Sequence, residues 1–285
     1  MNKIGVSLGA SSQTPEVYEK CKKAGVDCVE VSTGYIPDVS ALDFNTVKKN
    51  ADDAGIELWS YHLPFGPFEE LDISSCDASF RKNSINYSAE CIKKAADIGI
   101  KTFVIHPSGE PIQDGERSER IKCSQQSLAA LAEIAASYGG VLAVEDLPRS
   151  CLGRDSAEIL ELLEADKRLR VCFDTNHLLY ENCVDFVKKV CGKIITTHVS
   201  DCDFVNERHW LCGEGKVDWK ALYSALNEVK YAGPWLYEIG LWTPGTIVRP
   251  RHLVYEDFVK NANEIFEGKE LTVLGTPKEN LGMWG

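Results

Sequence analysis

Short apolar runs alternate with longer amphipathic stretches along the whole chain. The apolar runs are rich in β-branched and aromatic residues, as buried strands are. They are bounded by glycine or by polar residues, so each one predicts a separate strand. The sequence predicts eight strands, at residues 4–8, 28–32, 57–62, 102–106, 141–145, 171–174, 194–199 and 235–238.

The stretches between these strands carry apolar residues three and four positions apart, which predicts helices that cover a sheet. Gly25, Gly55, Gly99, Gly139 and Gly233 each follow such a stretch, as left-handed helix caps do. The helices are expected at residues 16–24, 45–54, 80–98, 118–138, 156–165, 183–190, 219–229 and 255–266.

Eight strand–helix units predict an α/β protein, a (β/α)8 or TIM barrel. We expect one domain over residues 1–285, in which 268–285 form a C-terminal tail with little helical pattern. The alternative is an open doubly wound sheet, which would be favoured by a glycine-rich nucleotide motif after the first strand. The segment SLGASSQTP at that position does not match this motif.

Composition narrows the class of protein. The net charge of −12 opposes binding to nucleic acid, and no apolar stretch is long enough to span a membrane. The N-terminus lacks the pattern of a signal peptide, and the 11 cysteines are scattered without any C-x-x-C pair. We therefore expect a cytoplasmic protein with reduced thiols. Its oligomeric state stays open, with a homo-oligomer as one expected form.

Ligand-type side chains stand at the ends of the last four predicted strands. A lone carboxylate at a strand end often caps the next helix, but four such groups on consecutive strands of a barrel meet at one rim. Three carboxylates and one imidazole suit a divalent ion, Mn²⁺ first and Mg²⁺, Co²⁺ or Zn²⁺ as alternatives. The predicted metal ligands are Glu145, Asp174, His198 and Glu238.

Further histidines fall near the same rim. His62 and His106 end two strands, and His177 follows Asp174 by three residues. We expect these side chains to bind substrate or additional metal, with bonds to nearby carbonyls as the simpler alternative for His62 and His106. His209 is a further candidate, whereas a surface role is expected for His252.

Three long connections follow strands that end in candidate site residues: 63–77, 200–218 and 239–250. Long ordered loops of this kind often close over a site. Their aromatic side chains are expected to wall a substrate pocket or to pack on the rim; they are Phe65, Phe68, Trp210 and Trp242. The basic side chains on these loops are expected to meet an acidic group of a substrate or to stay in solvent; they are Arg208, Lys216, Arg249 and Arg251.

A divalent ion bound to adjacent oxygens of a sugar would acidify the carbon between them and stabilise an enediolate. Two glutamates at the site, Glu145 and Glu238, could then move the proton as an acid/base pair.

The motifs VEDLP, FDTNH, THVSD and YEIG resemble those of the xylose isomerase-like TIM barrels, in particular the sugar phosphate isomerase/epimerase group with its ketose 3-epimerases. The resemblance runs over essentially the whole barrel. It implies that the four predicted ligands bind Mn²⁺ or a similar ion, that Glu145 and Glu238 are catalytic, and that His177 binds substrate. The epimerases also have a substrate-binding arginine after the metal histidine. Here position 204 is Phe, and the nearest arginine is Arg208.

A second branch of the same superfamily, the endonuclease IV-like nucleases for abasic sites, resembles this chain in a wider set of ligands for three zinc ions. Where that branch has an aspartate two residues before His209, this chain has Glu207. The segments STGYIPDVSALD and HLPFGPFEELDIS lack the basic character of DNA-inserting loops. The wider set comprises His62, His106, Glu145, Asp174, His177, His198, His209 and Glu238.

The sequence therefore predicts a metal-dependent isomerase or epimerase of a small sugar, sugar phosphate or sugar acid, without nucleic-acid or membrane partners. A zinc phosphodiesterase and an inosose-type dehydratase remain the alternatives among enzymes. A noncatalytic sugar-binding barrel would need a metal that is absent or fully held by protein ligands. The predicted substrate-binding residues are His62, His106, His177, Arg208, His209, Trp210 and Trp242.

Overall fold

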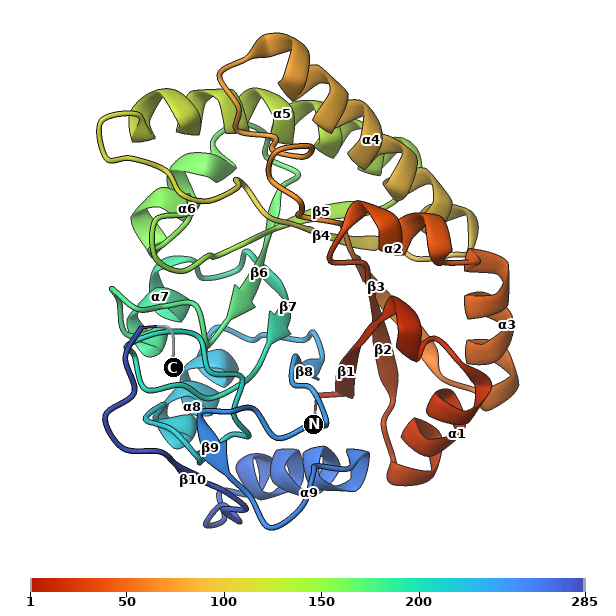
Figure 1. Cartoon of the computed structure of the whole chain (residues 1–285), viewed down its shortest axis with the longest axis vertical. Helices are drawn as coiled ribbons and strands as arrows, with labels where there is room; N and C mark the ends of the chain where they lie inside the picture. The colour runs from red at the N-terminus through yellow and green to blue at the C-terminus, as the bar shows by residue number, and fades with distance from the viewer. Residues whose placement is uncertain (1, 284–285) are drawn as a thin grey trace.

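The structure, a computed structural model, describes residues 2–283 and is a TIM barrel, as predicted. Figure 1 shows the strands at the centre with helices around them. Neighbouring strands of the eight-stranded sheet pair in parallel, in the order β7-β6-β5-β4-β3-β2-β1-β8. The strands are β1 (Ile4–Gly9), β2 (Cys28–Ser32), β3 (Glu57–His62), β4 (Thr102–Ile105), β5 (Val141–Glu145), β6 (Arg170–Asp174), β7 (Ile194–His198) and β8 (Trp235–Tyr237).

Helices follow the strands in the predicted alternation. Two short helical elements were not expected: a 3-10 turn at Ala10–Ser12 and the helix α2 (Ile36–Ala41) within a segment read as a loop. Six residues are too few to show a helical period, although Asp38 caps α2 by accepting from the Tyr35 amide. The other helices are α1 (Pro15–Ala24), α3 (Phe44–Ala54), α4 (Ala78–Asp97), α5 (Arg117–Ser137), α6 (Ser156–Leu163), α7 (Cys183–Lys189), α8 (Trp219–Glu228) and α9 (Tyr255–Phe266).

Glycines end several of these helices in the predicted way. Gly25 has φ of 93°, and its amide bonds back to the last turn of α1. Gly233 is different: it has no positive φ, and the left-handed residue after α8 is Lys230, at 58°. A Cβ at position 233 would lie 2.3 Å from the Ile195 carbonyl oxygen, so glycine is required there for close approach and not for a helix cap.

The barrel closes at a narrow seam between β7 and β8. Only one isolated bridge, Val199 with Tyr237, joins these two strands in the described part of the chain. The Val199 amide donates to the Leu236 carbonyl at 2.8 Å, and the Glu238 amide contacts the Val199 carbonyl at 3.4 Å. His198 and Glu238 therefore lie on either side of this seam.

Strand periodicity separates an apolar level of the barrel interior from a polar one. Side chains two residues apart on a strand face the same way, so Ala143 lies one level below Glu145 and Cys172 one level below Asp174. With Val104, these small side chains form a buried apolar cluster. The polar groups therefore gather at the carboxyl ends of the strands, the end where TIM barrels carry their sites.

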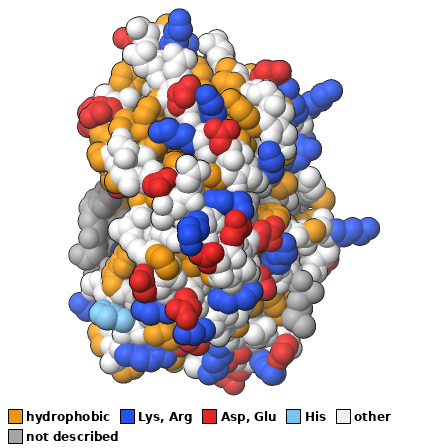
Figure 2. Space-filling model, turned by 90° about the vertical axis from the view of Figure 1, so that its right-hand side faces the viewer, with side chains coloured by type: hydrophobic (Ala, Val, Ile, Leu, Met, Phe, Trp, Pro, Cys, Tyr) orange, Lys and Arg blue, Asp and Glu red, His pale blue; other side chains and the backbone are white. Residues whose placement is uncertain are grey.

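The tail packs against the barrel. Its strand β10 (Thr276–Pro277) pairs antiparallel with β9 (Ile247–Val248), and the Gly282 carbonyl accepts from the Arg208 guanidinium at 2.7 Å. Within residues 2–283, no helix has both the length and the apolar character needed to cross a membrane. On the face drawn in Figure 2, acidic and basic side chains are interspersed.

Candidate metal centre

Glu145, at the end of β5, lies at the centre of the ligand-type side chains. Its Oε1 lies 2.8 Å from Nδ1 of His198, and its Oε2 lies 3.0 Å from Nε2 of His62 and 3.2 Å from Nε2 of His106. The side chain is buried. One oxygen of Glu145 therefore contacts His198, and the other contacts the two histidines His62 and His106.

The four predicted metal ligands come together. One ligand atom from each of Glu145, Asp174, His198 and Glu238 lies within 4.8 Å of the others. The Nδ1 atom of His198 is 3.9 Å from Oδ2 of Asp174 and 3.4 Å from Oε2 of Glu238. These separations place three carboxylates and one imidazole around a common point, as the strand ends predicted.

Asp174 supplies the test of whether a cation fits. Its Oδ1 accepts from the Asn176 amide at 2.6 Å, but Oδ2 is buried with no hydrogen-bond partner. Burial raises the pKa of Asp174 to about 7, with Glu238 and Glu145 adding to the rise and His177 opposing it. An unpartnered buried carboxylate oxygen beside two more carboxylates fits a divalent cation.

His62 and His106 flank the other side of Glu145. Nδ1 of His62 lies 2.8 Å from the Leu63 carbonyl, which only accepts, so Nδ1 carries the proton and Nε2 faces Glu145. Burial opposes charge on His62, but Glu145 outweighs it and raises the pKa to about 9. The Phe65 ring stacks on His106 at 4.5 Å between centroids and 10° between planes, so the β3–α4 loop covers this side.

Glu207, on the β7–α8 loop, brings His177 and His209 together. Its Oε2 lies 3.7 Å from Nε2 of each histidine, and its other oxygen pairs with Arg149. Burial opposes charge on Glu207, but the two histidines and Arg149 hold its pKa well below the usual value. The sequence analysis considered Glu207 only as a departure from a nuclease pattern.

Glu30 is a site residue that the sequence analysis missed. It lies in the middle of β2 and is fully buried. Its Oε1 lies 3.0 Å from Nε2 of His198, on the other side of the ring from the nitrogen that faces Glu145, and its two oxygens accept from Ser7 at 3.0 Å and Ser60 at 2.8 Å. The geometry at Nε2 is not that of a hydrogen bond, so the contact is an electrostatic one that places a carboxylate behind the imidazole ring. The available signal was an acidic residue inside the apolar run CVEV.

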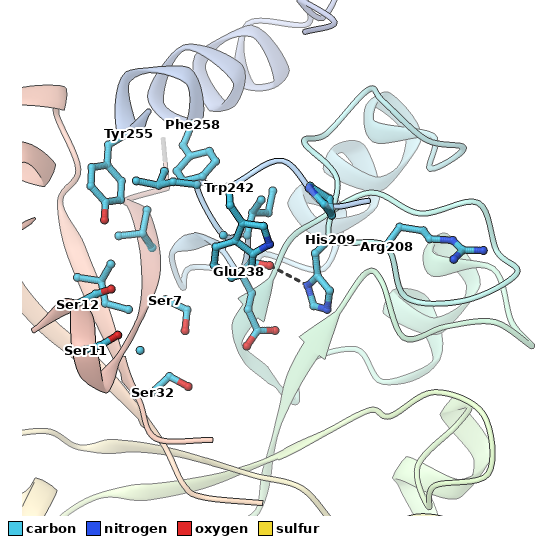
Figure 3. A pocket seen from close by; sticks show the side chains of 17 residues that line it. Ser7, Ser11, Ser12, Ser32, Arg208, His209, Glu238, Trp242, Tyr255 and Phe258 are labelled. Atoms are coloured by element: carbon cyan, nitrogen blue, oxygen red, sulfur yellow. Dashed lines mark hydrogen bonds between the residues drawn. The ribbon is translucent and has the colours of Figure 1, made fainter. Parts of the chain in front are cut away.

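A cavity of about 580 Å³ adjoins Glu238 and His209 (Figure 3). Nδ1 of His209 donates to the Glu238 carbonyl at 3.0 Å, which holds the imidazole at the cavity wall. The hydroxyls of Ser7, Ser11 and Ser32 line the cavity, and it also has apolar walls. The Trp242 ring is two-thirds exposed there. Hydroxyl groups beside aromatic and aliphatic walls suit a small polyol.

Two of the predicted substrate-binding residues, Arg208 and Trp210, do not present their polar groups to this cavity. The Arg208 guanidinium donates to Asp203 at 2.8 Å, and Figure 3 shows its side chain directed away from Glu238. Trp210 is buried, and its indole N–H donates to the Thr246 hydroxyl at 3.0 Å. Both polar groups are therefore engaged within the loops. The described lysine and arginine side chains thus place no unpaired cation at the cavity of Figure 3, since Arg208 is the only one that lines it.

The chain is similar to several known proteins. A relative in Methanocaldococcus jannaschii, itself uncharacterized, is 27% identical over 176 residues, 59% of this chain and 60% of that protein. The D-psicose 3-epimerase of Agrobacterium fabrum is 25% identical over 240 residues, 80% of each chain. A probable endonuclease 4 of Finegoldia magna is 23% identical over 249 residues, 79% of this chain and 86% of its own.

A solved structure of a D-tagatose 3-epimerase-like protein superimposes with a TM-score of 0.76 and 22% identity, covering 94% of this chain and 97% of that one. This likeness is one of fold. The model of the family described as xylose isomerase-like TIM barrel matches residues 18–255, which is most of the chain. The match includes β2 to β8, and only β1 of the eight barrel strands precedes it. The chain therefore belongs to the xylose isomerase-like TIM barrel family.

Proposed function

We propose that the protein is a metal-dependent sugar epimerase or isomerase that moves a proton at the carbon next to a carbonyl. The observation that carries this proposal is the position of Glu145 and Glu238 in one four-ligand cluster beside a cavity lined by serine hydroxyls. Two carboxylates beside a polyol pocket are the groups that such a proton transfer needs.

Glu145, Asp174, His198 and Glu238 would hold the ion, with Mn²⁺ as the first candidate. A divalent ion bound there would polarise the sugar carbonyl and stabilise the negative charge of an enediolate. Glu30 would help to orient His198 through its 3.0 Å contact with Nε2, and the Asn176 amide donates to Oδ1 of Asp174.

The two glutamates have different surroundings. The Glu238 side chain is 25% exposed and borders the cavity, whereas Glu145 is buried among His62, His106 and His198. Removal of a proton by one glutamate as carboxylate, and donation of a different proton to the opposite face by the other glutamate as carboxylic acid, would invert the carbon. Return to the neighbouring carbon would isomerise the sugar. His177 and His209 would bind the hydroxyl or carbonyl oxygens of the substrate.

The names of the relatives support a ketose as the substrate. They include D-psicose 3-epimerases and an L-ribulose 3-epimerase, and one neighbouring structure is a D-psicose 3-epimerase in the presence of D-fructose. The pairing of Arg208 with Asp203 favours an unphosphorylated sugar, because a phosphate needs an available cation or amide nest.

The test is exchange of the C1 and C3 protons, which flank the ketose carbonyl, with solvent deuterium, followed by NMR. The Mn²⁺-loaded protein is incubated in D₂O with D-psicose, L-ribulose or D-fructose. We expect exchange with at least one sugar, and its loss in the Glu238→Gln variant while Glu90→Gln, an exposed control on α4, keeps it. Absence of exchange with all three sugars, under Mn²⁺, Co²⁺ and Mg²⁺, would contradict the proposal.

A second candidate is a zinc phosphodiesterase. The observation that favours it is the equal 3.7 Å separation of Glu207 from His177 and His209, next to the His62–Glu145–His106 group. Against it, Arg149 already neutralises Glu207. Metal analysis separates the candidates: one ion per chain supports the epimerase, whereas three zinc ions and cleavage of abasic DNA support the phosphodiesterase.

A further inference from the structure

A second cavity of about 640 Å³ opens at the same end of the barrel as the metal centre. Its walls come from the loops that follow β3, β4, β5 and β6, and Met283 of the tail also lines it. The wall residues used below are Phe68, Glu110, Arg149, Arg154 and Tyr180.

Glu207 connects this second cavity with the metal centre. Arg149, in the wall of the second cavity, pairs with one oxygen of Glu207. The other oxygen lies 3.7 Å from His177 and from His209, and His209 lines the first cavity. The side chains of Arg149 and Glu207 thus lie between the two cavities, which are neighbours at this end of the barrel.

Two exposed aromatic rings stand in the second cavity. Tyr180 is 63% exposed and Phe68 is 37% exposed, whereas the large aromatic side chains of the barrel core are buried. A Cβ at Gly109 would lie 3.0 Å from Cδ1 of Phe68, so the absence of a side chain there makes room for the ring. Exposed rings beside hydrogen-bonding groups are typical of binding surfaces.

The charges around these rings are balanced within the protein. Arg149 pairs with Glu110 at 2.9 Å as well as with Glu207. Arg154 lies 3.7 Å from both Asp114 and Glu158, and its guanidinium is 5.5 Å from the centre of the Tyr180 ring. Each arginine therefore faces two carboxylates, which disfavours a phosphate or carboxylate ligand and leaves a neutral one.

Building on the proposed function, we propose that the second cavity binds a neutral sugar ring attached to the reacting ketose, so that the substrate class is a glycosyl ketose. The reacting ring would occupy the first cavity at the metal centre. The attached ring would stack on Tyr180 and Phe68 and hydrogen-bond to carboxylates and to Gln113. Because the chemistry needs free oxygens near the carbonyl, the glycosidic bond would join the far end of the ketose, at O4 or O6.

The proposal is tested by calorimetric titration of the full-length, Mn²⁺-loaded protein with D-fructose and with its 4-O- and 6-O-glucosyl derivatives. We expect one glucosyl derivative to bind about 10-fold more tightly than D-fructose, equivalent to about 1.4 kcal/mol. Tyr180→Ala should remove this advantage and leave D-fructose binding unchanged. Leu160→Ala, on the exposed face of α6, is the control and should change neither.

The inference is overturned if neither glucosyl derivative binds more tightly than D-fructose, or if the advantage survives both Tyr180→Ala and Phe68→Ala. Tighter binding of D-fructose 6-phosphate through Arg154 would also overturn it, since the ligand would then be anionic. Binding does not require turnover. If a glucosyl derivative binds more tightly through Tyr180 but no C3 exchange occurs, the second cavity is supported and the proposed function fails. If D-fructose exchanges its C3 proton but no glucosyl derivative binds more tightly, the proposed function is supported and the second cavity fails.

Discussion

Two groups of ligand-type side chains share Glu145, and they balance their charges differently. The first group, with Asp174, His198 and Glu238, contains three carboxylates and one imidazole, and Oδ2 of Asp174 has no partner. The second group adds only His62 and His106 to Glu145. Both ring nitrogens of His62 have partners, at 2.8 Å and 3.0 Å.

The difference shows where a cation is needed. Buried carboxylates without compensation are costly. Acidic neighbours also raise the pKa of His198, against the effect of burial, but one imidazolium offsets only one of the three carboxylates in the first group, which leaves room for an external cation. The second group can supply its own by protonating His62, whose pKa is raised to about 9. We therefore expect one ion in the first group, with the second group holding Glu145 in place. The following experiments test this contrast, from the largest expected effect to the smallest.

Metal removal should have the largest effect. Dialysis against a chelator should abolish C3 proton exchange, because the three carboxylates then lack the charge that organises them, and added Mn²⁺ should restore it. Elemental analysis should show about one ion per chain in the active protein, as the chemistry of the donor set implies. Undiminished exchange in metal-free protein would contradict the expectation that the first group needs a cation and the second does not.

Glu238→Gln should lower the rate of C3 exchange by about 10²–10⁴-fold, the usual contribution of a general acid or base. The variant should still fold, since the Glu238 side chain is partly exposed. The measurement is the exchange rate at saturating sugar, with Glu90→Gln as the matched control. If the exchange rate falls by less than about threefold, Glu238 does not act as an acid or base in the proton transfer.

Glu30→Gln should weaken metal binding by about 10–100-fold, because a carboxylate behind a ligand histidine orients the ring. Chelator competition gives the dissociation constant without any need for turnover. Circular dichroism should report the same fold as in the unmodified protein. Unchanged affinity would mean that Ser7 and Ser60 alone explain why this glutamate is buried.

His62→Gln should have the smallest effect on the ion, less than about 10-fold in affinity, if the second group only positions Glu145. It should lower the free energy of unfolding by about 1–3 kcal/mol, because Glu145 loses a buried partner. His252→Gln, on an exposed loop, is the control. Loss of a second equivalent of metal in His62→Gln would show that the second group also binds an ion.

The sequence predicted the barrel and the meeting of the four ligands because both depend on regular periodicity. Strand ends of a parallel barrel lie at one rim, so Asp174 and Glu238 could be placed without knowledge of the loops. Glu30 was missed because it lies before the end of its strand. Its contact with His198 joins β2 to β7, which do not pair with each other in the sheet.

The irregular loops could not be predicted in the same way. Arg208 and His209 are neighbours, yet the guanidinium pairs with Asp203 and the imidazole contacts the Glu238 carbonyl at the cavity wall. The turn that separates them depends on Asn176, whose side-chain oxygen accepts from the Arg208 amide at 2.9 Å. Such side-chain contacts between distant loops leave no periodic signal in the sequence.

The seam between β7 and β8 would give a bound ion a mechanical role. Two of the four proposed ligands, His198 and Glu238, stand on opposite sides of the weakest joint of the cylinder. An ion coordinated by both side chains would link the two strands across this seam. A free ion concentration of 100 times the dissociation constant would add about 2.7 kcal/mol to the stability of the closed barrel. The free metal concentration would then determine the stability of the closed barrel as well as the rate of the proposed reaction.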